Sequence, residues 1–138
     1  KEKFTRLIDE LQLNNNCLLH HTVSNIAEKY CMSSIFVLSS RYEGFGLVLA
    51  EAMSCGIPCV SFDCPHGPSD IIKDYEDGLL VEKENIKELA DKICYLIENE
   101  NVRIKMGHKA RENVKRFLPE NVMPQWKNLF ESLTYSSK

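Results

Sequence analysis

The chain has 138 residues, of which 43% are hydrophobic and 27% charged, and its formal net charge is −3. This length predicts one domain, and the hydrophobic fraction is sufficient for an ordinary core. The Lys and Arg residues are scattered along the chain, so the sequence excludes the basic stripe that a nucleic-acid-binding surface requires. No apolar run approaches the roughly 20 residues that a membrane-spanning helix needs.

Six cysteines occur, at positions 17, 31, 55, 59, 64 and 94, and none forms a C-x-x-C pair. Most fall inside predicted strands or helices, where cysteine is usually a small buried apolar side chain. We therefore expect buried free thiols in a reducing cytoplasm rather than a zinc site or disulfides.

The first part of the chain predicts two helices separated by a short strand. Apolar residues at positions 4, 7, 8 and 11 recur at helical spacing, and the asparagines at 14–16 end this first helix. Residues 17–20 follow as a short apolar strand. Ser24 is the predicted N-cap of the second helix, which has apolar residues at positions 26, 27, 30 and 31.

Strands and helices alternate through the middle of the chain. Residues 35–39 form an apolar strand, and a helix follows from Leu47 to about Cys55. Gly56 ends this helix and Pro58 prevents its continuation into the next strand, at residues 59–62.

Helices dominate the last part of the chain. Pro68 begins a short helix through Ile72, and the turn at 77–78 leads into a buried strand at 79–81. Asn85 caps the next helix. Two further helices are predicted, at about 102–117 and from Pro119 to the end, the last with Val122, Trp126, Phe130 and Leu133 along one side.

Short apolar strands that alternate with helices predict an α/β fold, with a Rossmann-like parallel sheet covered by helices on both faces. Ligands of such sheets bind beyond the carboxyl ends of the strands. Three segments follow predicted strands in this chain: residues 20–22, 42–51 and 63–67. We expect them to share one rim of the sheet.

Residues 42–51, with the sequence YEGFGLVLAE, join a strand to a helix through a glycine turn. The unpaired N–H groups and positive dipole end of a helix start bind anions. Gly44 and Gly46 permit positive φ and a close approach of the backbone to a ligand. Glu43 and Glu51 would repel a phosphate unless they bind hydroxyl groups. The stretch therefore predicts a ligand that is part phosphate and part polyol.

The run from Ser39 to Pro58 resembles the E-x7-E signature of the family-4 retaining glycosyltransferases. The resemblance continues through GPSDII at 67–72, DGLLV at 77–81 and the helices up to Trp126. It implies the GT-B architecture, in which two Rossmann-like domains face each other across a cleft. By this resemblance, residues 1–138 form a single partial domain, the C-terminal nucleotide-sugar donor-binding half truncated at its N-terminus.

The resemblance also implies a role for each residue of the signature. Glu43 would be the catalytic residue beside the transferred sugar, and Glu51 would accept hydrogen bonds from the ribose hydroxyls. The sugar would also be bound by the backbone N–H groups of Gly44, Phe45 and Gly46. The diphosphate would be bound by the backbone N–H groups of Leu47 and Val48. No metal or other cofactor is expected, because backbone dipoles would stabilise the leaving group.

As a whole, the resemblance implies a retaining hexosyltransferase that moves a sugar from a nucleotide-sugar, a UDP-sugar by family frequency, to a saccharide or lipid-linked acceptor in polysaccharide biosynthesis. It implies a cytoplasmic enzyme, with peripheral association of the full enzyme at the inner face of the membrane. The alternative is a catalytically inactive fragment or binding module that only binds nucleotide-sugar or needs a partner chain. An NAD-dependent oxidoreductase is disfavoured because Gly44-x-Gly46 lacks the third glycine of that fingerprint.

The chain departs from the family pattern at both ends. The family's donor domain begins with a strand, a helix and a second strand that carry an Arg/Lys pair for the diphosphate, and this chain begins after them. Those strands would lie between residues 17–20 and 35–39. Either the chain is a fragment of a longer enzyme, or the strand at 17–20 is re-paired or is swapped with a second copy in a homo-oligomer. The helix at 119–138 is expected to cross to the acceptor-binding domain.

Several polar residues outside the signature have structural interpretations. We expect Arg41 to form a salt bridge, Asp70 to offset the dipole in the first turn of its helix, and His108 to lie on the surface. His20, His21 and His66 are expected on the rim, most simply as solvated side chains.

Overall fold

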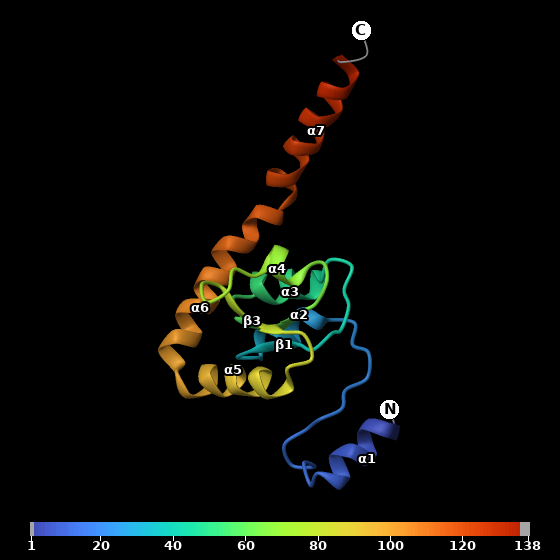
Figure 1. The fold of residues 1–138 in the computed structure, drawn as a ribbon, viewed down its shortest axis with the longest axis vertical. Helices are drawn as coiled ribbons and strands as arrows, with labels where there is room; N and C mark the ends of the chain where they lie inside the picture. The colour runs from blue at the N-terminus through green and yellow to red at the C-terminus, as the bar shows by residue number, and fades with distance from the viewer. Residues whose placement is uncertain (1, 136–138) are drawn as a thin grey trace.

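The computed structural model describes residues 2–135, which are organised around a parallel sheet of three strands (Figure 1). The strands are β1 (Phe36–Leu38), β2 (Cys59–Asp63) and β3 (Gly78–Glu82), in the order β1-β2-β3. Val60 of β2 is in register with Val37 on one side and Leu79 on the other. The central strand β2 is buried over four of its five residues because it has both neighbours and both faces covered.

Helices cover both faces of the sheet, as predicted (Figure 1). The helices are α1 (Glu2–Glu10), α2 (Ile26–Cys31), α3 (Leu47–Ser54), α4 (Pro68–Ile71), α5 (Ile86–Glu98), α6 (Glu100–Asn113), the 3-10 helix η1 (Val114–Phe117) and α7 (Pro119–Tyr135). Cys59 packs with α2, α3, α4 and the end of α6 on one face, whereas Val60 and Phe62 pack with α5 and the start of α6 on the other. This alternation follows from the period of two along a strand.

The local signals at helix ends are confirmed. Gly56 follows Cys55, the C-cap of α3, and has a φ of +76°, in the left-handed region that ends helices. Pro68 is the first residue of α4. The Asn85 side chain accepts a hydrogen bond from the Glu88 N–H at 3.1 Å, which caps α5.

Two helix boundaries differ from the prediction. The N-cap of α2 is Asn25 rather than Ser24, and its side chain makes no capping hydrogen bond. The helix predicted over 102–117 begins earlier, at Glu100, and tightens into η1 at Val114. A 3-10 turn at a helix C-terminus is common because it satisfies carbonyls that lack an α-helical partner.

The strand predicted at Cys17–His20 is wrong. These residues are exposed and belong to no strand, with Leu18 79% exposed, and they lie in the long connection between α1 and α2 that runs outside the sheet (Figure 1). A strand needs a partner for its backbone N–H and C=O groups, and among residues 2–135 β1 pairs only with β2. Re-pairing within the chain is therefore also wrong, whereas a swap between two copies stays a prediction.

The six cysteines are free thiols. Cys59 and Cys64 are buried as expected, whereas Cys17, Cys31 and Cys94 are exposed, against expectation. Burial raises the pKa of the Cys59 and Cys64 thiols, because a thiolate is poorly solvated inside a protein.

Within residues 2–135, no helix combines the length and the apolar character needed to cross a membrane.

The last helix begins at Pro119, as predicted, and projects away from the sheet (Figure 1). Its apolar side is open to solvent, with Trp126 50% and Phe130 58% exposed. The two rings stack on each other with centroids 5.7 Å apart. That α7 crosses to another domain stays a prediction.

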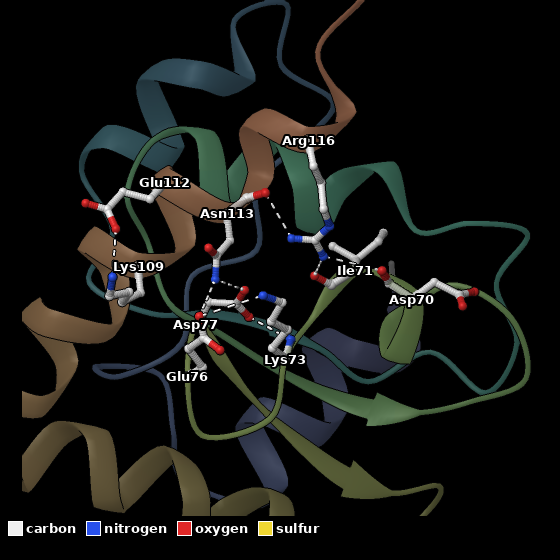
Figure 2. Close-up of polar contacts among 9 residues, drawn as sticks. All are labelled: Asp70, Ile71, Lys73, Glu76, Asp77, Lys109, Glu112, Asn113 and Arg116. Atoms are coloured by element: carbon white, nitrogen blue, oxygen red, sulfur yellow. Dashed lines mark hydrogen bonds and ion pairs between the residues drawn. The ribbon is translucent and has the colours of Figure 1, made fainter. Parts of the chain in front are cut away.

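A buried carboxylate ties the turn before β3 to the end of α6 (Figure 2). Asp77 is fully buried, and its carboxylate accepts hydrogen bonds from the Lys73 N–H at 2.7 Å and the Asn113 side-chain amide at 2.9 Å. The same amide donates to the exposed Glu76 carboxylate at 2.8 Å. This hydrogen bond lowers the pKa of Glu76. The buried and exposed carboxylates thus share one donor.

We predict that Asp77→Ala lowers the free energy of unfolding by about 1–3 kcal/mol, because it removes the buried acceptor of the Lys73 N–H and one of the two acceptors of the Asn113 amide. Glu76→Ala is the matched control, since water can replace an exposed carboxylate, and its effect should stay within about 0.5 kcal/mol. Urea unfolding followed by circular dichroism measures both. Equal losses for the two variants would contradict the importance assigned to burial.

Candidate functional site

The turn between β1 and α3 exposes the start of a helix. Gly46 is the N-cap of α3 and adopts the left-handed conformation, with φ 84° and ψ 45°, which few residues other than glycine take easily. The first helical residue, Leu47, is 66% exposed, and the first turn contains no acidic residue. The free N–H groups and positive dipole of this turn can therefore bind an anion from solvent.

The predicted site residues lie along this turn and the first turns of α3. Glu51 stands one helical turn after Leu47, which places the two on the same side of the helix. Glu43, before the turn, is half-buried. Among the rest, Gly44, Phe45 and Leu47 are exposed, Val48 is half-buried and Gly46 is buried. The predicted assignment of sugar, diphosphate and ribose to these residues stays a prediction.

The loop after β2 packs directly against this turn. Gly67 has a φ of +102°, and a Cβ atom placed on it would lie 2.0 Å from the carbonyl oxygen of Phe45. The Gly67 N–H donates to the Asp70 carboxylate at 3.2 Å, which confirms Asp70 in the first turn of α4. Of the three segments predicted to share the rim, residues 42–51 and 63–67 are therefore in contact, whereas residues 20–22 follow a strand that is not formed.

The side chain of Phe45 packs on η1. Its ring meets the Phe117 ring edge to face, with centroids 5.5 Å apart. The Arg116 guanidinium carbon lies 4.5 Å from the centre of the Phe117 ring. Nη2 of Arg116 donates to the Ile71 carbonyl at 2.5 Å (Figure 2). The 3-10 helix thus supports both the glycine turn and α4. Sequence reasoning missed this contribution, because no local pattern links Phe117 to Phe45.

Glu51 has a hydrogen-bond donor on a neighbouring helix. The Tyr30 hydroxyl, on α2, donates to Oε2 of Glu51 at 3.1 Å. Burial, the hydrogen bond to Glu51 and the charge of that carboxylate raise the pKa of Tyr30 to about 12. The phenol consequently remains protonated, and a donor, at any physiological pH. The sequence indicated only that Tyr30 is on the inner face of a helix.

The other rim candidates are on the surface. Arg41 forms the predicted salt bridge, with its Nε 2.8 Å from a Glu84 carboxylate oxygen, and its exposure limits the contribution to about 0–1 kcal/mol. His66 is exposed at a φ of +65°, with its ring 6.3 Å from that of Tyr42. His108 is exposed, as predicted. The rim position predicted for His20 depended on the strand at 17–20, which is not formed.

No group of three or more His, Cys, Asp or Glu side chains in the described part of the chain is arranged to hold a metal ion. Residues 43–51 instead offer the carboxylates of Glu43 and Glu51 and the backbone N–H groups between them.

The family model for glycosyl transferases group 1 matches residues 1–113. The chain belongs to this family. It is 37% identical over 133 residues to the poly(ribitol-phosphate) alpha-N-acetylglucosaminyltransferase of Staphylococcus aureus, covering 96% of this chain and 27% of that protein. Our chain therefore spans about a quarter of the length of this group 1 relative.

Solved structures of glycosyltransferases share the fold. A mutant of S. aureus TarM in complex with fondaparinux, alpha-GlcNAc-glycerol and UDP superimposes with a TM-score of 0.88 at 37% identity, over 94% of this chain and 27% of that one. The pneumococcal O-GlcNAc transferase GtfA in complex with UDP and GlcNAc gives 0.82 at 26% identity, over 97% and 28%. The α/β fold is that of the C-terminal domain of GT-B glycosyltransferases, as predicted.

We predict that Gly67→Ala destabilises the rim, because its Cβ cannot fit beside the Phe45 carbonyl and its φ is unfavourable for alanine. We expect the free energy of unfolding to fall by about 1–3 kcal/mol. Gly44→Ala is the matched control, since a Cβ there meets nothing within 4 Å. Thermal unfolding of the two variants side by side measures the difference, and a Gly67→Ala variant as stable as the parent would show that the two loops do not pack as described.

Proposed function

We propose that this chain is the donor-binding part of a retaining hexosyltransferase that uses a UDP-sugar. The observation that carries the proposal is the exposed start of α3, framed by Glu43 and Glu51, in a domain of the group 1 glycosyltransferase family. A ligand that is anionic in its middle and hydroxylated at both ends fits that order of groups. A nucleotide-sugar has this order, with a sugar, a diphosphate and a ribose.

The diphosphate would bind at the N–H groups of Leu47 and Val48. These belong to the first turn of α3, where the dipole alone contributes roughly 0.3–2 kcal/mol toward a negative charge. The same groups would stabilise the charge that develops on the nucleoside diphosphate as it leaves. The absence of an acidic residue from this turn of α3 supports the assignment.

The two glutamates would bind hydroxyl groups on either side of the diphosphate. Glu43 precedes the glycine turn and would hold the transferred sugar, with the backbone of Gly44, Phe45 and Gly46 alongside. Glu51 is exposed on α3 and would accept hydrogen bonds from the ribose. Hydrogen bonds to a charged group contribute about 1.5–3 kcal/mol each, which compensates for placing carboxylates near phosphates.

UDP is the nucleotide we propose, because the TarM and GtfA complexes contain it. The acceptor would be a saccharide or a lipid-linked molecule. The name of the S. aureus relative gives poly(ribitol-phosphate) as the acceptor of that protein. Residues outside this chain would bind that acceptor.

Isothermal titration with UDP, a UDP-sugar and GDP tests the donor site. We expect Glu51→Ala to weaken UDP and the UDP-sugar alike, by about 10- to 100-fold. Glu43→Ala should weaken only the UDP-sugar, because Glu43 would contact the sugar alone. Glu98→Ala, at an exposed carboxylate at the end of α5, is the control and should change nothing. Binding of none of the nucleotides would refute the donor site.

Transfer distinguishes an enzyme from a binding module. The chain can replace the segment that it matches in the S. aureus relative, and sugar transfer by this hybrid can then be assayed. We expect the hybrid to transfer sugar, and we expect the Glu43→Ala substitution to abolish this transfer. A hybrid that binds UDP-sugar but transfers nothing would favour the binding module.

A further inference from the structure

We propose that Tyr30 is a positioning residue for Glu51, fixing one carboxylate oxygen so that the other faces the ribose of the donor. The inference rests on the proposed function of Glu51 and extends it to a residue on another helix. Its basis is the 3.1 Å hydrogen bond from the Tyr30 hydroxyl to Oε2 of Glu51, which joins α2 to α3.

The two partners differ in burial. Tyr30 is 6% exposed, belongs to the core cluster beneath α3, and meets the Phe36 ring edge to face with centroids 5.6 Å apart. Glu51 is exposed, and a free glutamate samples many rotamers that must be given up on binding a ligand. A rigid phenol that holds one carboxylate oxygen reduces this loss before the ligand arrives, which is preorganisation.

The chemistry of a phenol suits this role. An ionised carboxylate has about four acceptor positions on its two oxygens, so one hydrogen bond at Oε2 leaves Oε1 available for ribose hydroxyls. A lysine or arginine at position 30 would neutralise the carboxylate and compete for both oxygens. A neutral O–H donor orients Glu51 and leaves its charge in place, and the charge strengthens the hydrogen bonds that hydroxyl groups donate to it.

In a simpler interpretation, Glu51 only accepts the hydrogen bond that the buried Tyr30 hydroxyl needs. Two ligands distinguish this structural role of the hydrogen bond from the positioning role. UDP has both ribose hydroxyls, and 2′,3′-dideoxy-UDP has neither. Tyr30→Phe removes only the hydroxyl and keeps the ring in the core. We expect this variant to bind UDP about 2- to 10-fold more weakly, the range that one hydrogen bond provides, and to bind 2′,3′-dideoxy-UDP as the parent does. Tyr95→Phe, at an exposed tyrosine on α5, should leave both affinities unchanged.

Isothermal titration of the chain and its variants measures their affinities for both ligands, and circular dichroism verifies the folded state. Equal weakening of both ligands by Tyr30→Phe would show a structural role and overturn the inference, as would no weakening of UDP. Glu51→Ala separates this failure from that of the proposed function. If Glu51→Ala leaves the preference for UDP over the dideoxy ligand unchanged, then Glu51 does not bind ribose and the proposed function itself fails at this position.

Discussion

The site depends on one close contact, between Gly67 and the backbone of Phe45. The loops that follow β1 and β2 meet there with no space for a side chain. Parallel strands bring their carboxyl ends to the same edge of a sheet, but this alone sets only the approximate positions of the loops. Contact between two backbones fixes the glycine turn against α4, and therefore fixes where the start of α3 points.

The end of α6 and η1 support this arrangement. Arg116 donates to the carbonyls of Ile71 and Asn113 (Figure 2). Its guanidinium stacks on the Phe117 ring, which supports the Phe45 ring. Asn113 in turn binds the buried Asp77. The end of α6 and η1 thus connect α4, the turn before β3 and the glycine turn through a single set of hydrogen bonds and ring contacts. A rim made of loops gains a rigid support in this way.

Sequence reasoning predicted what is determined locally and missed what depends on distant partners. Gly56, Pro68 and Asn85 act within a few residues of themselves, so their helix ends could be read directly. The prediction of a strand at 17–20 was wrong because a strand forms only beside a neighbouring strand. The apolar composition of a segment does not show whether such a neighbour is present. Tyr30 was assigned to a helix face correctly, but its hydroxyl partner lies on another helix, 21 residues further along the chain. The burial of Asp77 likewise depends on α6, which no short motif indicates.

The chain contains one tryptophan, and its position on α7 determines what its fluorescence reports. Trp126 is half exposed, stacks on Phe130 and lies on the helix that projects away from the sheet (Figure 1). Its emission therefore reflects the surroundings of α7 and not the core around β2. Any molecule that covers the apolar side of α7 would shift that emission toward the blue, whereas a ligand confined to the rim would leave it nearly unchanged, so a single intrinsic probe separates events at the two places.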